Sequence, residues 1–353
     1  MTDELATKAP ESDAQATTNP APPPAPTDSA GAPTNPPMRD HCISDRPTPT
    51  GRSSTGEITK LNGVDVYISK PADYPHTPSR LLLLLTSGTG LHSVNNQLQA
   101  DTFATQGYVV VMPDLFAGDP APNSRVENNN QPSSSSPSSS NNNTEETSMS
   151  LLDTLRFKAA ETAKSFLIDM WLARHTEEKV MPVLDKVLDG AGDEFADAVS
   201  RGGGVYAVGY CFGARYVLLL AAEKKGGSRQ QRQGQGQGGG DGDGDGDVDE
   251  EAGVVAPRIR AGALAHPTLV SRGDWEGLRA PVSVVCVEHD PLFPDEVRIA
   301  GEEYMSGHGV EHEVQVYPGV PHGFAVVGEY EDANIKVAQA TAYEQMLKWI
   351  NEH

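Results

Sequence analysis

Short apolar segments alternate with helix-like segments along most of the chain. Residues 81–86 and 108–113 are apolar on both faces, which is typical of parallel strands that helices cover on both sides. Between them, residues 94–106 carry apolar side chains at helical spacing and stop at Gly107. A strand, a sharp turn and a helix are predicted over residues 205–220, further strands at residues 261–265, 282–287 and 312–317, and a closing helix at residues 335–350.

Two further regions complete this pattern. Residues 56–70 alternate apolar and polar side chains around the Asn-Gly pair at 62–63, a dipeptide typical of a tight hairpin turn. Residues 151–188 predict two helices that meet between Trp171 and Pro182. Because strands alternate with helices, the predicted fold class is α/β, with a doubly wound, mostly parallel sheet and helices on both faces.

Three stretches have a composition that cannot support a core. Residues 1–40 are rich in Pro, Ala and Thr, residues 121–149 are mostly Ser, Asn and Pro, and residues 226–251 run from Gln and Gly repeats into an acidic repeat. Their small apolar surface does not offset the entropy of ordering the chain, so we predict that all three are disordered. Residues 41–353 then form a single domain with two disordered insertions and a core of roughly 250 residues, a usual size for one α/β domain.

Charge and cysteine content narrow the class of protein. The formal charge of −22 disfavours nucleic acid and anionic membrane as partners, because both require clustered Lys and Arg. Three scattered cysteines, Cys42, Cys211 and Cys286, are too few for a disulfide framework and fit a reducing compartment. The N-terminus has no apolar signal segment, and the aliphatic runs are far shorter than a membrane span. We expect a cytoplasmic protein and leave its oligomeric state open.

The turn within residues 205–220 carries the most informative motif. Residues 209–213 read Gly-Tyr-Cys-Phe-Gly, the spacing of a nucleophile elbow in which two glycines relieve crowding and the central side chain projects above the sheet. The central side chain here is the thiol of Cys211. The alternative is structural, because an unpaired cysteine also packs as a small buried apolar residue.

Two polar residues follow later strands at the same edge of the predicted sheet. Asp290 comes just after the strand at 282–287, and His322 comes just after the strand at 312–317. The order of nucleophile, acid and histidine is that of α/β-hydrolase triads. An imidazole that takes the thiol proton creates a thiolate nucleophile, and a carboxylate on the other ring nitrogen fixes the tautomer. The sequence therefore predicts a triad of Cys211, Asp290 and His322.

Hydrolysis through a thiolate also requires donors for the oxyanion of the tetrahedral intermediate. One N–H comes from the residue after the nucleophile, here Phe212, and one from the loop after an earlier strand, here Gly88 in the loop at 87–90. Loss of one such donor typically costs about 3 kcal/mol of transition-state stabilisation. The loop at 87–90 is therefore predicted to matter nearly as much as a triad member.

The chain resembles the dienelactone hydrolase family of the fungal cytosolic kind, over most of its length from about Glu57 onward. The matching stretches are residues 82–90, 94–120, 209–215, 265–267, 288–290 and 321–325. The resemblance implies an α/β-hydrolase fold and a hydrolase of lactones or small carboxylic esters, with a small-molecule partner, no cofactor and no metal. By this resemblance Cys211 is the nucleophile, His322 the base and Asp290 its partner.

Two departures from the family pattern bear on the substrate. Bacterial members carry a glutamate in the loop that corresponds to 87–90, where this chain has Ser-Gly-Thr-Gly. Members that bind an anionic lactone often place an arginine after the His-Gly-Phe motif, where this chain has Ala-Val-Val at 325–327. A neutral ester, thioester or lactone is therefore favoured. The missing carboxylate keeps open a non-catalytic or redox-sensing role, and a cysteine elbow of the amidotransferase or peptidase kind is a third reading.

Other residues near the predicted site have two interpretations. Thr89, Phe324 and Trp171 are candidates for the substrate pocket, although an aromatic residue at helical spacing, as at Trp171, is more typical of a core. His266 also follows a strand and so competes with His322 for the role of base. Since the histidine of the triad comes last in the chain, we interpret His266 as a pocket-lining or structural residue.

Four further features are interpreted as chemically inert. His289 is next to the predicted acid but points away from it if the segment is extended. Cys286 lies inside a buried strand. His41 with Cys42 lacks the second ligand pair of a zinc site, and the acidic repeat at 241–252 lacks the final glutamate of a calcium-binding loop.

Overall fold

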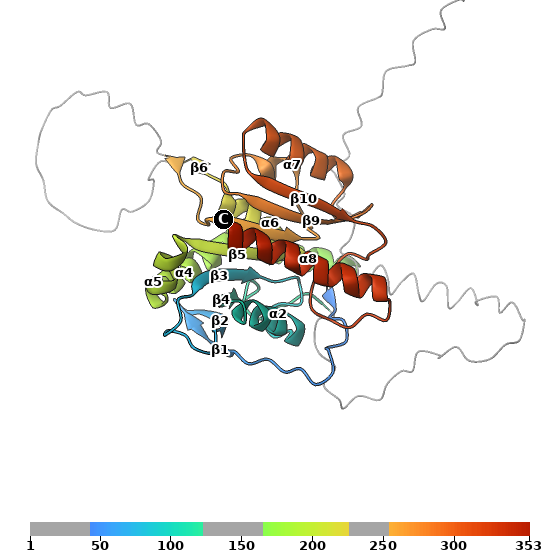
Figure 1. The fold of residues 1–353 in the computed structure, drawn as a ribbon. Coiled ribbons are helices and arrows are strands. Elements are labelled where there is room, and N and C mark those ends of the chain that lie inside the picture. Colours follow the sequence, from blue (N-terminus) through green and yellow to red (C-terminus); the bar gives the residue numbers. More distant parts are fainter. Residues whose placement is uncertain (1–42, 123–164, 226–253) are drawn as a thin grey trace, which may run out of the picture. The chain divides into compact units, whose positions relative to one another are not determined.

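The computed structural model describes residues 43–122, 165–225 and 254–353 (Figure 1). Within this part of the chain, no helix is long and apolar enough to cross a membrane. Several predictions lie outside the described residues: those for residues 1–40, for residues 123–149 of the second low-complexity stretch, for residues 226–251, for His41 with Cys42 and for the acidic repeat.

One eight-stranded sheet organises the described part of the chain (Figure 1). Its strands are β1 (Glu57–Leu61), β2 (Val64–Ser69), β3 (Arg80–Leu85), β4 (Tyr108–Pro113), β5 (Val205–Tyr210), β8 (Ala261–Ala265), β9 (Val282–Val287) and β10 (His312–Tyr317). They lie in the order β1-β2-β4-β3-β5-β8-β9-β10. The six strands from β4 to β10 are parallel to one another, whereas β2 pairs antiparallel with β4 and with the edge strand β1. The predicted mostly parallel sheet is confirmed.

Helices cover both faces of this sheet, as predicted. They are α2 (Val94–Ala104), α4 (Glu177–Glu194), α5 (Ala196–Gly202), α6 (Phe212–Ala221), α7 (Asp295–Gly307) and α8 (Ala333–Glu352). Along β3, Leu83 packs with α4, α6 and α7 in one buried cluster, whereas its neighbour Leu84 packs with α2 and α8 in another. Because successive side chains of a strand point to opposite faces, the sheet separates two cores.

The local elements follow the sequence pattern closely. The predicted hairpin joins β1 to β2, with positive φ at Asn62 (47°) and Gly63 (82°), as a tight turn of this kind requires. Residues 165–174 are helical and α4 begins at Glu177, so the two helices meet where predicted. Helix α7 was not predicted, because its buried residues are only Gly301 and Met305 and its apolar face is narrow.

One short antiparallel pair stands apart from the main sheet. Strands β6 (Lys224–Lys225) and β7 (Val254–Val255) pair on the two sides of residues 226–253. The chain therefore leaves and re-enters the described fold at one place, and the insertion does not interrupt the order of the main sheet. Strand β8 follows β7 directly and lies between β5 and β9.

Candidate active site

The predicted elbow is a sharp turn between β5 and α6. Cys211 precedes α6 with φ 50° and ψ −111°, a conformation that non-glycine residues rarely adopt. Its N–H donates to Ala265 O (3.1 Å), and the N–H of Gly213 donates to Thr86 O (3.0 Å). These bonds tie the turn to the ends of β8 and β3, so Cys211 lies at the carboxyl edge of the sheet.

Close packing requires both glycines of the elbow. A Cβ atom at Gly209 would lie 2.6 Å from Val217 Cγ2, and a Cβ atom at Gly213 would overlap the carbonyl oxygen of Leu85. Cβ atoms essentially never approach other atoms so closely. The absence of side chains at these two positions lets α6 pack directly against the ends of β3 and β5, which holds the turn in its strained conformation.

Asp290 and His322 meet at the same edge of the sheet. Asp290 follows β9 and His322 follows β10, and the two strands are parallel neighbours. The Nδ1 atom of His322 lies 2.6 Å from Asp290 Oδ2, and Asp290 Oδ1 accepts a hydrogen bond from Leu292 N (3.0 Å). Both side chains are buried. The carboxylate is thus fixed by the backbone and in turn fixes the ring of His322.

Cys211 and His322 are coupled electrostatically. Burial by itself lowers the pKa of His322, but the charge of Cys211 and the interactions with Cys211 and Asp290 outweigh burial and raise this pKa to about 9. Because Nδ1 of His322 is bonded to Asp290, Nε2 is the ring nitrogen left to interact with the sulfur. The structure therefore brings together the three residues of the predicted triad.

His266 lies beside this group. It follows β8 with φ 37°, and its side chain has no exposed surface. Its ring centroid is 5.0 Å from that of His322, and the rings of Tyr210 and Phe324 surround it at 6.0 Å and 6.2 Å. Burial and the charge of His322 lower the pKa of His266 well below its usual value, so this ring stays neutral.

Polar contacts shape the loop after β3. Thr89 Oγ1 lies 3.0 Å from Ser87 Oγ and accepts a hydrogen bond from Asn96 Nδ2 (3.0 Å). The bond from the elbow to the end of β3 brings this loop toward Cys211. Phe212 is the first residue of α6, so its N–H belongs to the first turn, where N–H groups have no partner within the helix. Gly88 and Phe212 remain the predicted oxyanion donors.

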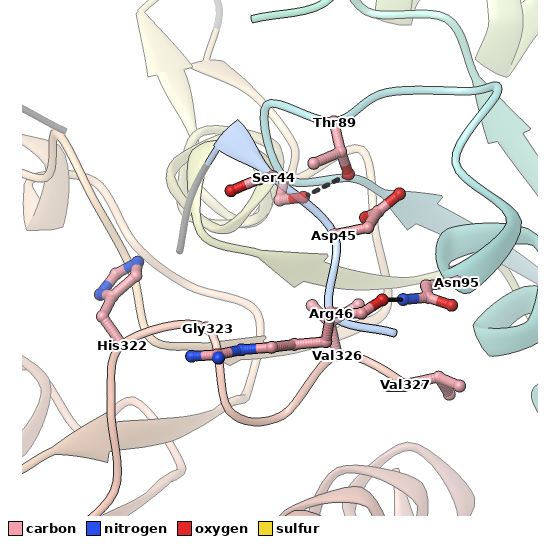
Figure 2. Close-up of a pocket in the computed structure, with 10 residues that line it drawn as sticks. Ser44, Asp45, Arg46, Thr89, Asn95, His322, Gly323, Val326 and Val327 are labelled. Carbon is pink, nitrogen blue, oxygen red and sulfur yellow. Dashed lines mark hydrogen bonds between the residues drawn. The ribbon is translucent and has the colours of Figure 1, made fainter. Parts of the chain in front are cut away.

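Residues 43–56, which we call the N-terminal strap, contribute side chains to a pocket that His322 also lines (Figure 2). Ile43 at its start is fully buried, and the strap then follows α2 and the loop after His322 without forming a strand. Three successive residues of the strap accept hydrogen bonds. Asp45 Oδ1 accepts one from Ser93 Oγ (2.9 Å), and the carbonyl oxygen of Arg46 accepts one from Asn95 Nδ2 (2.7 Å). The carbonyl oxygen of Pro47 accepts one from Glu329 N (2.8 Å).

The strap brings two charged side chains into a pocket with His322. Figure 2 shows the Arg46 side chain extending across this pocket toward His322, with Thr89 and Asp45 on the other wall. The volume of about 20 Å³ admits a single water molecule. Asp45 and Arg46 were not predicted as site residues, because they lie in a Pro- and Thr-rich stretch without a local motif.

The predicted pocket residues have different surroundings. Thr89 lines the pocket of Figure 2. Trp171 is buried with its ring 5.3 Å from that of Phe212, and its Nε1 donates to Asp119 O (2.7 Å). Phe324 is buried against His266. Trp171 and Phe324 are thus packed in the interior and do not line the pocket of Figure 2.

A larger cleft of about 450 Å³ borders Phe212. This volume lies within the range of about 300–1,000 Å³ that small-molecule sites occupy. The guanidinium of Arg215 faces the cleft but is paired with Asp274 and Glu177, each at 2.8 Å. The cleft therefore combines apolar and charge-compensated walls, and its other lining residues are Leu172, His175, Thr176, Glu178, Tyr216 and Leu269.

Comparison with known sequences shows the family of this chain. The sequence pattern of the dienelactone hydrolase family matches residues 64–228 and 252–353. The chain belongs to the dienelactone hydrolase family. Membership makes it a hydrolase of carboxylic esters or lactones. The matched region contains the elbow and the loops that carry Asp290 and His322, whereas the strap lies outside it.

Fungal relatives are similar to this chain over most of their length. Hydrolase pyvD of Aspergillus violaceofuscus is 26% identical over 298 residues, which is 84% of this chain and 90% of that protein. Dienlactone hydrolase 1 of Gibberella moniliformis is also 26% identical, over 84% of this chain and 87% of that protein. The fold is similar to that of propionate-bound esterase 2 from Thermogutta terrifontis, with a TM-score of 0.51, 14% identity, and coverage of 85% of this chain and 96% of that chain.

A carboxylate from outside the matched region lines the pocket beside His322. The loop at 87–90 has no acidic residue, but Asp45 of the strap accepts a hydrogen bond from Ser93 and lines the same pocket as Thr89. The carboxylate thus reaches the pocket from a segment that precedes the matched region by more than ten residues. Sequence order alone gives no signal for this approach.

Proposed function

We propose that this dienelactone hydrolase relative cleaves small lactones or carboxylic esters, thioesters included, through the thiolate of Cys211. The buried contact of 2.6 Å between His322 Nδ1 and Asp290 Oδ2, at the sheet edge that carries the elbow, supports the proposal most strongly. Burial lowers the pKa of His322, yet Cys211 and Asp290 together raise it to about 9. A thiolate paired with an imidazolium is the activated form of a cysteine nucleophile, and the 2.6 Å bond from Asp290 keeps the imidazole in one tautomer.

In the first half-reaction, the sulfur of Cys211 attacks the carbonyl carbon of the substrate. The sulfur electron pair forms the C–S bond, and the carbonyl π pair moves to oxygen, which accepts hydrogen bonds from the N–H groups of Gly88 and Phe212. When the tetrahedral intermediate collapses, the C–O bond breaks and the alkoxide takes the proton of His322. The products are an acyl-cysteine, a neutral imidazole and an alcohol, which stays on the acyl chain when the substrate is a lactone.

The strap bears on which substrate charge the site accepts. A neutral substrate was favoured because no arginine follows the His-Gly-Phe motif, but Arg46 supplies a guanidinium on the His322 side of the site. We therefore extend the proposed range to esters and lactones that carry a carboxylate. Entry of such a group requires the strap to shift, since the present volume of about 20 Å³ is that of a single water molecule.

Mutation of the nucleophile tests the proposal. We expect Cys211→Ala to abolish hydrolysis of p-nitrophenyl acetate while the circular dichroism spectrum stays unchanged. Cys286→Ala is the matched control, because burial raises the pKa of the Cys286 thiol to about 12 and keeps that thiol protonated. Undiminished turnover by Cys211→Ala would contradict the proposal.

Alkylation separates the hydrolase from a redox-sensing protein with the same fold. An activated Cys211 reacts with iodoacetamide near neutral pH far faster than Cys286, which mass spectrometry of the digested protein measures. Fast alkylation without turnover of any neutral or carboxylated ester, lactone or thioester would favour the redox role. Equal, slow alkylation of both residues would favour a non-catalytic protein.

A further inference from the structure

Three successive residues of the loop that follows the base hold the strap, and we call residues 328–330 the strap dock. The N–H of Glu329 donates to Pro47 O (2.8 Å), and Glu329 Oε1 accepts a hydrogen bond from Thr50 N (3.0 Å). The dock residues on the two sides of Glu329 both lie against Arg46. The dock therefore contacts the one strap residue whose guanidinium reaches toward the base.

Gly328 leaves the space that the stem of Arg46 occupies. A Cβ atom at position 328 would lie 2.6 Å from Arg46 Cβ and 3.3 Å from Arg46 Cγ. The φ of Gly328 lies outside the left-handed region, so its backbone conformation does not require glycine. The close approach of the Arg46 stem does require it.

Tyr330 lies beneath the guanidinium of Arg46. Arg46 Cζ is 4.9 Å from the centroid of the Tyr330 ring, within the distance of about 6 Å at which an aromatic face attracts a cation. The ring is buried, and burial raises the pKa of the Tyr330 hydroxyl, so that hydroxyl stays neutral. Because Asn95 Nδ2 also donates to Arg46 O (2.7 Å), Arg46 is held at its backbone, its stem and its guanidinium.

The segment between the base and the dock is itself held by α8. Gln339 Nε2 donates to the carbonyl oxygens of Phe324 (3.1 Å) and Val326 (2.6 Å). His322 and the dock lie at the two ends of this segment, only a few residues apart. The dock therefore sets where the guanidinium of Arg46 lies relative to His322.

We propose that Tyr330 and Gly328 are positioning residues, which hold the guanidinium of Arg46 where it recognises a carboxylate on the substrate. This inference rests on the proposed function, because it presupposes hydrolysis at Cys211. An arginine side chain has many rotamers to lose when it binds a ligand. The dock restricts these rotamers before the substrate arrives, so less freedom is lost on binding.

The dock also determines where the pocket opens. Since Arg46 is held, the room for a carboxylate comes from the opposite wall, which carries Asp45 and Thr89 (Figure 2). A shift of Asp45 removes a like charge from the pocket as it makes room, which favours an anionic group. The guanidinium stays in place while the substrate binds.

A ratio of two rates tests the inference. The substrates are mono-p-nitrophenyl adipate, which bears a carboxylate, and its uncharged methyl ester, and the ratio is kcat/KM for the first over kcat/KM for the second. Loss of folded protein lowers both rates by the same factor and leaves the ratio unchanged. We expect Tyr330→Leu to lower the ratio about fivefold, mainly through KM of the charged ester. Fivefold corresponds to about 1 kcal/mol, the usual size of a cation–π contact.

Three further variants separate positioning from packing. Tyr330→Phe keeps the aromatic face and should keep the ratio within about twofold of the wild type. Tyr343→Leu is the matched control, because Tyr343 packs against the same buried cluster but lies on Phe103, with ring centroids 5.0 Å apart. It should leave the ratio unchanged. In the Arg46→Ala background, Tyr330→Leu should lower the ratio no further, since the ring acts only through the arginine.

A glycine variant tests the contact with the stem. In Gly328→Ala the new Cβ forces the stem of Arg46 to move, so we expect the ratio to fall about fivefold as well. Gly192→Ala is the control, because no atom lies within 4 Å of its Cβ, and it should leave the ratio unchanged.

Three results would overturn the inference. An unchanged ratio in Tyr330→Leu would show that the ring does not position Arg46. Equal losses in Tyr330→Leu and Tyr330→Phe would show that the aromatic face is not what matters. An unchanged ratio in Arg46→Ala would show that the guanidinium does not recognise the carboxylate. Undiminished hydrolysis of both esters by Cys211→Ala would instead contradict the proposed function, and this outcome is distinct because it concerns the rates and not their ratio.

Discussion

The two sides of the candidate site are built by different means. On the sheet side, Cys211, Asp290 and His322 each follow a parallel strand, and all three are buried. On the strap side, residues 43–56 form no strand, and the buried side chain of Ile43 and hydrogen bonds to α2 and to the loop after His322 hold them. Backbone pairing between strands positions the first group, whereas side-chain contacts position the strap.

Because of this difference, we expect the sheet side to determine activity and the strap side to determine which substrate is accepted. A parallel sheet sets the spacing of its strand ends, so a change on the sheet side is expected to remove activity. The strap contributes polar side chains such as Arg46 beside an already assembled Asp290–His322 pair. A change in the strap is therefore expected to alter which substrate is accepted while the chemical step remains.

The largest effect is expected at the elbow glycine that contacts β3. In Gly213→Ala the new Cβ overlaps the backbone of Leu85, so we expect the free energy of unfolding to fall by about 3 kcal/mol and activity to be lost. Urea denaturation measures the first effect. Gly192→Ala in α4 is the matched control, since no atom lies within 4 Å of its Cβ and alanine favours a helix by about 1 kcal/mol. Equal stability of both variants would contradict the packing argument.

The next effect is expected at the acid. Asp290→Asn keeps the shape of the side chain but removes the charge that holds His322, so we expect kcat to fall roughly 10³- to 10⁴-fold. The pKa of His322 should fall below its value of about 9, as NMR titration of the ring can measure. Asp295→Asn, at a carboxylate that pairs with Arg298, should leave kcat unchanged. A loss of less than tenfold in Asp290→Asn would contradict the proposed triad.

A third effect concerns pH and leaves the chain intact. The raised pKa of His322 means that its proton is present below pH of about 9 and is lost above it. An alkyl ester needs this proton for its leaving alkoxide, so its kcat/KM should fall about tenfold per pH unit above 9. A p-nitrophenyl ester does not need the proton and should show no such fall. Parallel profiles for the two esters would show that His322 does not act as the acid.

The smallest effect is expected in the strap. Arg46→Ala should lower kcat/KM for an ester that bears a carboxylate about tenfold more than for its methylated, uncharged analogue, because a charged hydrogen bond is lost. Arg52→Ala is the matched control, since Arg52 lies on the same strap but contacts Thr102 rather than the pocket. An equal change for both esters would show that Arg46 does not select for charge.

Much of the fold could be predicted because its signals are local. Apolar runs such as those in β4 and β9 and the Asn-Gly turn at 62–63 determine structure over a few residues. Helix α7 was not predicted because little of it is buried, and its buried face carries few apolar residues. Local patterns therefore predict elements that bury much surface and miss those that bury little.

The residues of the candidate site were predictable to different degrees. Cys211, Asp290 and His322 could be listed from the sequence because strand ends of a parallel sheet gather at one edge whatever the loops contain. Arg46 could not, since its approach to His322 depends on hydrogen bonds between segments far apart in the chain. The contact between the buried ring of His266 and His322 could likewise not be predicted from the sequence, because burial depends on the packing of the whole core.

The sequence by itself determined the class of fold, the elbow and the order of the three residues proposed to react. These depend on the periodicity of apolar residues, on the positions of glycines and on the order of residues in the chain, all of which can be read from the linear sequence. Only the tertiary structure decided which charged and neutral side chains surround His322, with Arg46 on the strap side and His266 on the sheet side. Electrostatics and burial depend on distance in space, and the fold alone sets those distances.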